Sequence, residues 1–178
     1  YTLAINNGPN SLHGGPTGFH ARVWDAEQIN ESTLKLTYTS ADGEEGFPGE
    51  LKVTVVYSLS EDNEFIIEYS ATTDKKTIVN LTHHAFFSLS GIQKDTASVE
   101  NNILTLNANF YVPVDETSIP YGRIDAVEGT PMDFRTEQAL GDRIDDDYLP
   151  LTQAGGYDHN YVLNNSGEDV EYVASLYD

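Results

Sequence analysis

Apolar and polar side chains alternate with a period of two along much of the chain. The clearest runs are STLKLTYTS at 32–40, ELKVTVVYSL at 50–59 and NEFIIEYSA at 63–71. Successive side chains of a strand point to opposite faces of a sheet, and these runs are rich in β-branched and aromatic residues. Each run therefore predicts a β-strand with one buried face, and turn-forming residues separate the three runs.

Weaker patterns predict further strands at 76–89, 98–108, 122–128, 159–163 and 170–176. The one helical suggestion is a turn or two within RTEQALGDRI, at 135–144. No repeat, low-complexity linker or domain boundary stands out. We therefore expect residues 1–178 to belong to a single all-β domain, an antiparallel β-sandwich with no helix longer than about two turns.

Two adjacent histidines interrupt the apolar run NLTHHAFFSLSG at 80–91. On a strand His83 and His84 would point to opposite faces and could not share one site. The row of side chains that contains His83 is otherwise apolar, whereas the row that contains His84 is polar with one aromatic, Phe86. His84 is therefore the better candidate for proton transfer to a polar ligand, and a packed structural histidine remains the alternative for each of the two.

Two glycine-containing clusters hold further candidates, NSLHGGPTGFHARVW at 10–24 and GGYDHNYVL at 155–163. The two glycines after His13 allow positive φ and a close approach of ligand or backbone, although a simple glycine-rich loop has the same pattern. An ionised Asp158 accepts hydrogen bonds and could bind adjacent sugar hydroxyls, with turn capping as the alternative. His20 and His159 carry no further signal, and we expect both at the surface.

Composition excludes several classes of function. The chain has 178 residues, 39% of them hydrophobic and 21% charged, which is typical of a globular protein. Its net charge of −20 would repel phosphate backbones and anionic membrane surfaces, so we expect neither nucleic acid nor a membrane as a partner. No apolar run approaches the roughly 18 residues of a membrane span. Cysteine is absent, which excludes a disulfide framework and a thiol nucleophile.

Other kinds of site find little support. No H-x-H or H-E-x-x-H spacing exists, so a zinc site is not predicted. The acidic stretch DGEEGFPGE at 42–50 lacks the ligand spacing of a calcium loop, and we interpret it as a solvated turn. There is no nucleophile elbow and no phosphate-binding glycine loop. A pair of catalytic carboxylates, as in glycosidases, remains an alternative because acidic residues are plentiful.

Five stretches, taken in order, resemble the aldose 1-epimerases, or galactose mutarotases. They are NSLHGGPTGFHARVW, DGEEGFPGEL, NLTHHAFFSLSG, YVPVDETSIPYGRIDAVEGTPMDFR and GGYDHNYVL. The resemblance implies a large antiparallel β-sandwich, the galactose mutarotase-like supersandwich, of which this chain would be the central portion. It also implies interconversion of the α and β anomers of free aldohexoses such as galactose and glucose, by general acid and base catalysis. No metal, nucleotide or other cofactor is implied.

The same resemblance assigns roles to four residues. His84 matches the histidine of the family's N-L-T-N-H motif, which is the general acid. His13 matches the histidine of H-G-G, which holds the sugar near its ring oxygen and assists protonation. Asp158 matches the aspartate of G-Y-D-H, which binds sugar hydroxyls, and Phe86 stands where the family has an aromatic residue that could stack on a sugar face. We expect His13, His84 and Asp158 to converge on one concave surface.

Departures from the family pattern qualify the resemblance. His83 stands where asparagine is common, and Ala85 stands where serine is common. The family's general base is a glutamate downstream of G-Y-D-H, but here only Glu168 and Glu171 follow Asp158, and neither has the expected surroundings. An arginine-bearing segment expected upstream of H-G-G is also missing. We therefore expect the general base outside this chain, and exposed apolar rows on strands cut from a larger sandwich.

Two functional hypotheses follow. The first is a hexose mutarotase, an isomerase whose only partner is the free sugar. The second is a non-catalytic carbohydrate-binding sandwich of mutarotase-like fold. A glutamate opposite His84 across the sugar cleft would favour the first hypothesis. We expect a cytoplasmic protein, with the periplasm or secretion as alternatives.

Overall fold

The computed structural model describes residues 1–91, 98–167 and 169–178. The described chain forms two compact units, Tyr1–His84 and Ala85–Asp178, and each is described here by itself. The single domain expected from the sequence stays a prediction.

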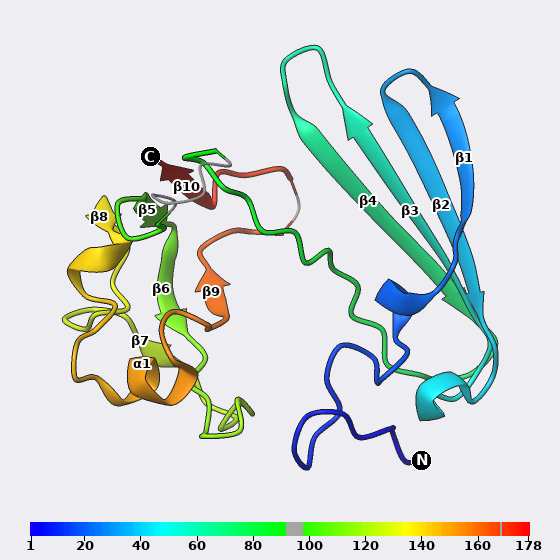
Figure 1. Ribbon diagram of the computed structural model, residues 1–178, viewed down its shortest axis with the longest axis horizontal. Coiled ribbons are helices and arrows are strands. Elements are labelled where there is room, and N and C mark those ends of the chain that lie inside the picture. Colours follow the sequence, from blue (N-terminus) through cyan, green and yellow to red (C-terminus); the bar gives the residue numbers. More distant parts are fainter. Residues whose placement is uncertain (92–97, 168) are drawn as a thin grey trace. The chain divides into compact units, whose positions relative to one another are not determined.

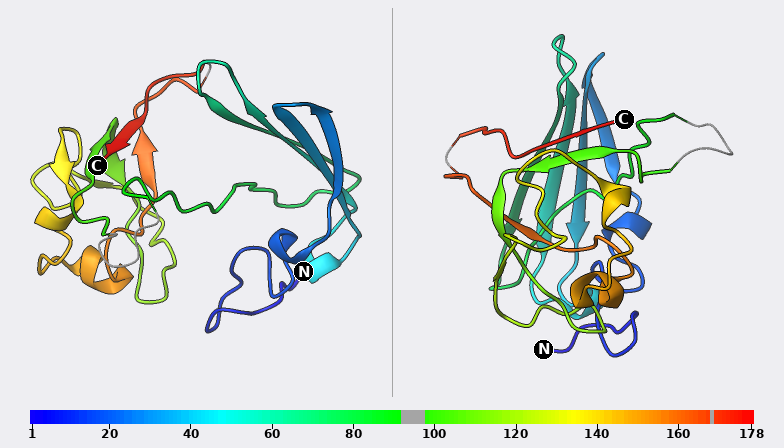
Figure 2. Two further views of the ribbon diagram at one scale, coloured as in Figure 1. Left: turned by 45° about the horizontal axis from the view of Figure 1, so that its top comes forward. Right: turned by 90° about the vertical axis from the view of Figure 1, so that its left-hand side faces the viewer.

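The first unit is built on one four-stranded antiparallel sheet with the strand order β1-β2-β3-β4 (Figure 1 and Figure 2). The strands are β1 (Asp25–Asn30), β2 (Thr33–Ser40), β3 (Leu51–Leu59) and β4 (Phe65–Thr73). The last three confirm the three strands predicted from alternation. The sequence of β1, DAEQIN, has no apolar row, and all six residues are exposed. This strand exists because it pairs with β2, which no local pattern announces.

The pairing register places the predicted apolar rows on one face of the sheet. Leu36 on β2 lies opposite Val55 on β3, and Val55 lies opposite Tyr69 on β4. The residues of this face that form the buried core are Leu51, Val53 and Val55, and the half-buried side chains of Phe19, Trp24, Tyr57, Ile67 and Leu81 pack against them. Two segments outside the sheet, one before β1 and one after β4, are thereby anchored on the same core.

Apolar side chains remain exposed on β4. Phe65 is 53% exposed, Ile66 41% and Tyr69 36%. We expected exposed apolar positions on the strands, and β4 has them. Phe65 and Tyr69 lie on one face of β4 and Ile66 on the other, so apolar groups could still be buried on either face.

The second unit contains two three-stranded antiparallel sheets with the orders β10-β5-β8 and β7-β6-β9 (Figure 1). Their strands are β5 (Ile103–Leu106), β6 (Ala108–Tyr111), β7 (Asp125–Ala126), β8 (Gln138–Ala139), β9 (Tyr161–Leu163) and β10 (Ala174–Tyr177). The strands predicted at 98–108, 122–128, 159–163 and 170–176 are therefore present but short. Every pairing among the described strands is antiparallel, which confirms the all-β antiparallel class.

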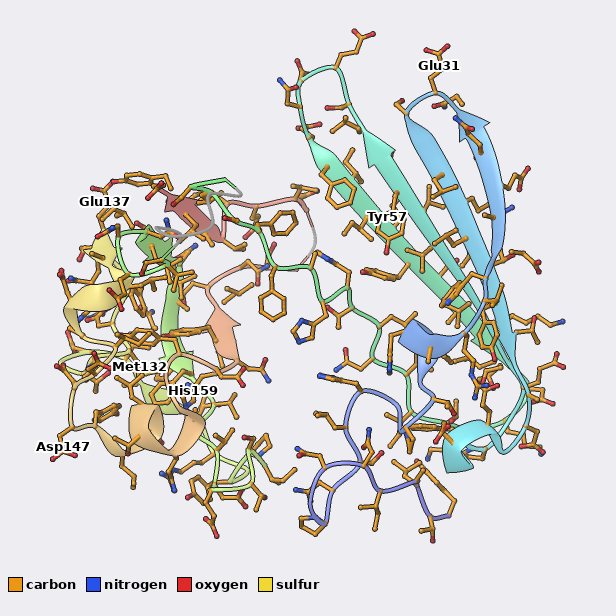
Figure 3. All side chains as sticks on the ribbon, in the orientation of Figure 1. Glu31, Tyr57, Met132, Glu137, Asp147 and His159 are labelled. Atoms are coloured by element: carbon orange, nitrogen blue, oxygen red, sulfur yellow. The ribbon has the colours of Figure 1, made fainter. Side chains whose placement is uncertain are left out.

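A second hydrophobic core compensates for these short strands. It contains Tyr111, Val127, Met132 and Leu151, none more than 2% exposed, with the half-buried Tyr148, Tyr157 and Tyr161 packed around them. Figure 3 labels Met132 within this unit. Much of this core comes from connecting segments, whose backbone carbonyls are not all paired within a sheet. Side-chain hydroxyls donate hydrogen bonds to some of these carbonyls and so stabilise the segments.

Helices are short, as predicted. The longest described helix, α1 (Leu149–Ala154), has Pro150 in its first turn and ends at Gly155, whose φ is 72°. The others are 3₁₀ turns, namely η1 (Phe19–Ala21), η2 (Glu44–Gly46) and η3 (Leu140–Asp142). The turn η3 corresponds to the helical suggestion at 135–144, whereas α1 was not predicted. In the described parts, no helix is both long enough and apolar enough to cross a membrane.

The strand predicted at 76–89 is wrong. These residues are described throughout, but none belongs to a strand, and residues 82–89 are all exposed. A strand needs a neighbour that offers complementary N–H and C=O groups, and this stretch has no strand partner among the described residues. Alternation in a sequence reports the side-chain pattern and not the presence of that partner.

Candidate functional site

His13 and His84 lie together in the first unit. Their ring centroids are 5.3 Å apart, and the rings meet edge to face with an angle of 80° between their planes. Both side chains are exposed. Two imidazoles that are accessible to a ligand and adjacent to one another form a site at which a proton can be donated and recovered.

Packing on the sheet core positions both histidines. Leu81, three residues before His84, packs against Val53 and its neighbours, while Phe19 and Trp24 follow His13 and pack on the same core. The Trp24 indole N–H donates a hydrogen bond of 3.0 Å to the Phe19 carbonyl, which fixes the chain between the H-G-G loop and β1. The two histidines therefore meet because two segments distant in sequence cover one face of the sheet.

The H-G-G loop has the backbone conformation for which its glycines were noted. The φ angles of His13, Gly14 and Gly15 are 53°, 81° and 97°, so three successive residues are left-handed. The Gly15 N–H donates to the Leu12 carbonyl at 3.0 Å. A side chain at Gly15 would also overlap the carboxylate of Glu45, so both the φ angle and the available space require glycine there.

Glu45 stabilises this loop through its carboxylate. Its Oε1 accepts hydrogen bonds from the N–H and the hydroxyl of Thr17, and it lies 3.8 Å from the Arg22 guanidinium. The Glu45 side chain is only 13% exposed and that of its neighbour Glu44 only 15%. The interpretation of 42–50 as a solvated turn is therefore wrong for these two carboxylates. Sequence reasoning missed Glu45 because its partners are remote in the sequence.

Glu44 has a different function in the same turn. Its Oε2 accepts a hydrogen bond of 2.7 Å from the Tyr38 hydroxyl, and its Oε1 lies 3.4 Å from Arg22 Nε. Burial, together with the hydrogen bond to Glu44, raises the pKa of the Tyr38 hydroxyl. Glu44 therefore ties the turn to β2, whereas Glu45 ties it to the H-G-G loop.

His83 contacts an aromatic ring on β4. Its ring lies 6.5 Å from the ring of Phe65 on β4, nearly perpendicular to it at 85°. The different surroundings that the sequence predicted for the two neighbouring histidines stay a prediction. The strand alternation from which that prediction was made is absent, because residues 76–89 form no strand.

Asp158 belongs to the second unit, in the segment between α1 and β9. Its side chain and that of Asn160 are exposed, whereas Tyr157, His159 and Tyr161 are half-buried. The Asp158 carboxylate accepts no hydrogen bond from the described residues, so turn capping finds no support there. The convergence of Asp158 with His13 and His84 stays a prediction.

His159 is not the surface residue that was expected. Both ring nitrogens are buried, and neither has a hydrogen-bond partner in the described parts of the chain. The ring meets Tyr111 edge to face, with centroids 5.7 Å apart, and its place in the second unit is visible in Figure 3. Burial lowers the pKa of His159, against the opposing effect of the neighbouring Asp158 charge. The neutral imidazole is therefore a packing group.

The remaining candidate residues lie outside the histidine pair. Phe86, in the second unit, is 90% exposed and presents its ring to solvent. Both Glu171 carboxylate oxygens accept from the Ser166 backbone N–H, at 3.3 and 3.2 Å, so this carboxylate stabilises a turn. Glu168 lies outside the described residues. Among the described residues, no group of three histidine or acidic side chains could hold a metal ion.

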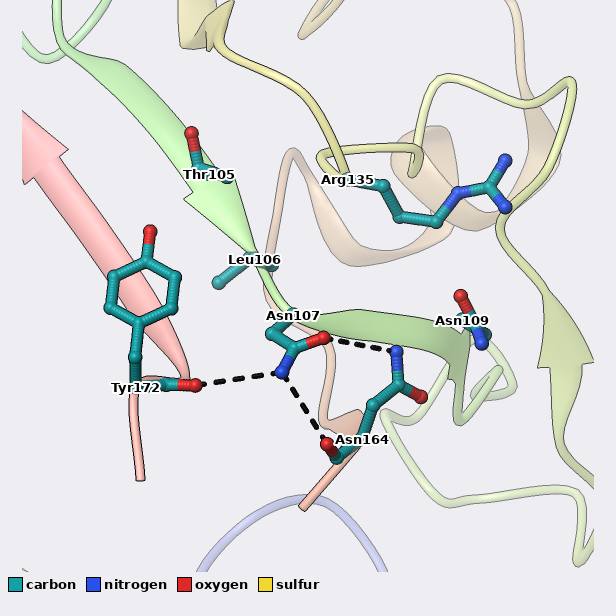
Figure 4. A pocket seen from close by; sticks show the side chains of 7 residues that line it. All are labelled: Thr105, Leu106, Asn107, Asn109, Arg135, Asn164 and Tyr172. Carbon is teal, nitrogen blue, oxygen red and sulfur yellow. Dashed lines mark hydrogen bonds between the residues drawn. The ribbon is translucent and has the colours of Figure 1, made fainter. Parts of the chain in front are cut away.

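A cavity of about 250 Å³ in the second unit contains none of these residues (Figure 4). It is lined by Thr105, Leu106, Asn107, Asn109, Arg135, Asn164 and Tyr172. The amides of Asn107 and Asn164 bond to one another at 3.2 Å, and Arg135 forms two hydrogen bonds with the Asp133 carboxylate, at 2.9 and 2.8 Å. Much of its polar lining is therefore already satisfied, and it offers no acid–base pair.

The antiparallel sheets and the exposed imidazole pair define a mostly-β protein with a site suited to proton transfer on a polar ligand. Comparison with known protein families then identifies the family. The family model described as "Aldose 1-epimerase" matches residues 1–178, so the chain belongs to this family.

Individual relatives agree with the family assignment. The chain is 41% identical to galactose mutarotase of Sus scrofa over 168 residues, which are 94% of this chain and 46% of that protein. It is 39% identical to aldose 1-epimerase of Escherichia coli over 178 residues, which are 99% of this chain and 50% of that one. The chain thus spans about half the length of the curated relatives it matches.

A solved structure shows the same fold. The crystal structure of galactose 1-epimerase from Lactobacillus acidophilus superposes with a TM-score of 0.87 at 32% sequence identity. The match covers 99% of this chain and 51% of the other. The galactose mutarotase-like fold expected from the sequence is therefore confirmed.

Proposed function

We propose that the protein is an aldose 1-epimerase that interconverts the α and β anomers of free hexoses such as galactose and glucose. The observation that carries this proposal is the exposed His13–His84 pair, with ring centroids 5.3 Å apart and both chain segments anchored on one core. Relatives named galactose mutarotase and aldose 1-epimerase, at about 40% identity over half their length, support it.

In the proposed reaction His84 is the general acid. It donates a proton to the ring oxygen of the sugar while a general base removes the proton of the anomeric hydroxyl, and the bond between C1 and the ring oxygen breaks. The resulting aldehyde rotates about C1–C2, and the reverse proton transfers close the ring as the other anomer. His13 holds the ring oxygen beside His84 and assists the protonation, and we assign no residue of this chain to the base.

Two residues of the second unit would bind the sugar. The exposed Asp158 carboxylate is an acceptor for neighbouring sugar hydroxyls, and the exposed Phe86 ring offers an apolar surface for a sugar face. Neither role requires a change of charge during the reaction. Loss of either should therefore weaken binding more than it slows the proton transfers.

The test is polarimetric and uses the protein that carries this chain. Freshly dissolved α-galactose should reach anomeric equilibrium faster than the spontaneous rate, and His84→Asn should lower kcat by roughly 10²- to 10⁴-fold while the protein stays folded. His83→Asn is the matched control, because it makes the same substitution one residue away and should change kcat no more than a few-fold.

Other outcomes decide between the two hypotheses. A wild-type protein that binds galactose without accelerating its mutarotation would favour the non-catalytic sugar-binding module. If His83→Asn abolishes turnover and His84→Asn retains it, the assignment of the acid is wrong.

A further inference from the structure

The segment that presents Asp158 is fixed by its neighbours and not by its own carboxylate. Tyr157, His159 and Tyr161 alternate with the exposed Asp158 and Asn160, so every second side chain from Tyr157 to Tyr161 points toward the core. The Asp158 carboxylate makes no hydrogen bond with the described residues. Its position therefore depends on how firmly the residues on either side are held.

Two tyrosine hydroxyls supply that support. Tyr157 donates to the Pro131 carbonyl and Tyr161 donates to the Met132 carbonyl, each at 3.1 Å. The two acceptors are consecutive in the chain, so both sides of Asp158 are tied to one short stretch, which we call the 130–133 segment. The Asn160 carbonyl also accepts from the Val112 N–H at 2.8 Å, just beyond β6.

The 130–133 segment is itself held in place. Arg143 Nη2 donates to the Asp133 carbonyl at 2.8 Å, and Nη1 contacts the Thr130 carbonyl at 3.5 Å. Met132 is fully buried. All four carbonyls of the segment thus receive a side-chain donor, which makes it a rigid support for the Asp158 loop.

Aromatic packing reinforces the same contacts. The ring of buried Phe134 lies 4.9 Å from that of Tyr157 and 6.5 Å from that of Tyr161, edge to face in both cases. Burial raises the pKa of both tyrosine hydroxyls, so they remain protonated donors in neutral solution. Loss of either hydroxyl would leave a carbonyl without its side-chain donor but would keep the ring packing.

We propose that Tyr157 and Tyr161 are positioning residues for Asp158, whose hydroxyls hold the sugar-binding carboxylate in place through the 130–133 segment. This inference rests on the proposed function, in which Asp158 binds sugar hydroxyls. Neither tyrosine is a catalytic residue. They determine the orientation in which the carboxylate meets the sugar, and so act on substrate binding.

The experiment uses Tyr157→Phe, Tyr161→Phe and the double variant in the protein that carries this chain. The double variant should raise KM for galactose roughly three- to tenfold and leave kcat within about threefold, because a loosened carboxylate binds the sugar less well. Tyr148→Phe is the matched control. Its hydroxyl bonds to that of Tyr111 at 2.9 Å in the same core and makes no hydrogen bond with the 130–133 segment. This control should lower stability without raising KM.

A double-mutant cycle with Asp158→Asn separates positioning from general destabilisation. If the tyrosines act through Asp158, removing their hydroxyls from the Asp158→Asn protein should leave KM at the value of Asp158→Asn alone. An equal rise of KM in both backgrounds, or an equal rise in Tyr148→Phe, would overturn the inference.

The cycle also keeps the inference distinct from the function. If Asp158→Asn raises KM but the double tyrosine variant does not, the positioning role is wrong and the proposed function stands. If Asp158→Asn changes neither KM nor kcat, the sugar-binding role of Asp158 is wrong and the positioning role fails with it.

Discussion

The two loops that carry the candidate residues are held in different ways. The H-G-G loop of the first unit is stabilised by a half-buried carboxylate, Glu45, and has three successive left-handed residues. The Asp158 loop of the second unit is tied by neutral tyrosine hydroxyls in an aromatic core. A charged support is strong but leaves a buried ion if its partner is lost, whereas a neutral hydroxyl is weaker and insensitive to pH near neutrality.

The difference follows from what each loop must present. In the first unit the loop exposes an imidazole, and its backbone turns sharply at Gly15, where the left-handed φ requires glycine. Glu45 accepts the hydrogen bond of the Thr17 N–H in the same loop. In the second unit the loop exposes an acidic side chain, and a second carboxylate beneath it would repel Asp158. Neutral donors from alternating tyrosines avoid that repulsion. Substitutions should therefore affect the two loops differently.

Among substitutions in the two loops and their supports, the largest effect is expected from His13→Asn. Asparagine tolerates positive φ better than most residues, so the loop conformation should survive at a φ of 53° while the imidazole is lost. Loss of the group that assists protonation should lower kcat by roughly ten- to a hundredfold. Polarimetry on galactose measures this, with His20→Asn, an exposed histidine in the following 3₁₀ turn, as the control. An unchanged kcat in His13→Asn would remove His13 from the mechanism.

A smaller effect is expected from Glu45→Ala. It removes the acceptor for the Thr17 N–H and a partner of Arg22, so the H-G-G loop should loosen and kcat/KM should fall by roughly tenfold. Glu44→Ala is matched in position and burial but removes the bond to Tyr38 instead. Both variants should lose about 1–3 kcal/mol of stability, measured by denaturant unfolding, yet only Glu45→Ala should lose activity. Equal losses of activity would mean that the turn acts only through stability.

The regular sheet of the first unit was predictable, because its apolar rows follow local alternation. The strands β2, β3 and β4 were read directly from 32–40, 50–59 and 63–71. Strand β1 was not, since its residues are all exposed and it depends on pairing with β2. The error at 76–89 has the converse cause: an alternating pattern without a partner strand.

The candidate residues were easier to predict than their supports. His13, His84 and Asp158 stand in motifs that a family resemblance can identify. Glu45 bonds to Thr17, 28 residues away in the chain, and Tyr161 bonds to the Met132 carbonyl, 29 residues away. Such contacts are set by the tertiary fold and leave no local signal. The burial of His159 follows from the same core and was missed for the same reason.

The smallest effect concerns His159, whose imidazole packs against Tyr111 in the core that supports the Asp158 loop. Burial lowers the folded-state pKa of His159 below its usual value of about 6.5, so the unfolded chain binds a proton more readily. The contribution of His159 to stability should therefore be fully present above pH 6.5 and decline as the pH falls toward the folded-state pKa. The decline can be no steeper than tenfold in the folding equilibrium per pH unit for one proton.

His159→Phe keeps a ring against Tyr111 but cannot titrate. The phenyl ring has carbon atoms in place of the two buried nitrogens, so it needs no hydrogen-bond partner. Unfolding measured between pH 7.5 and 5.5 should show a shallower loss of stability for this variant than for the wild type. His20→Gln, which removes an exposed histidine, should keep the wild-type slope. Should the His159→Phe and wild-type slopes coincide, protonation of His159 would not be coupled to folding.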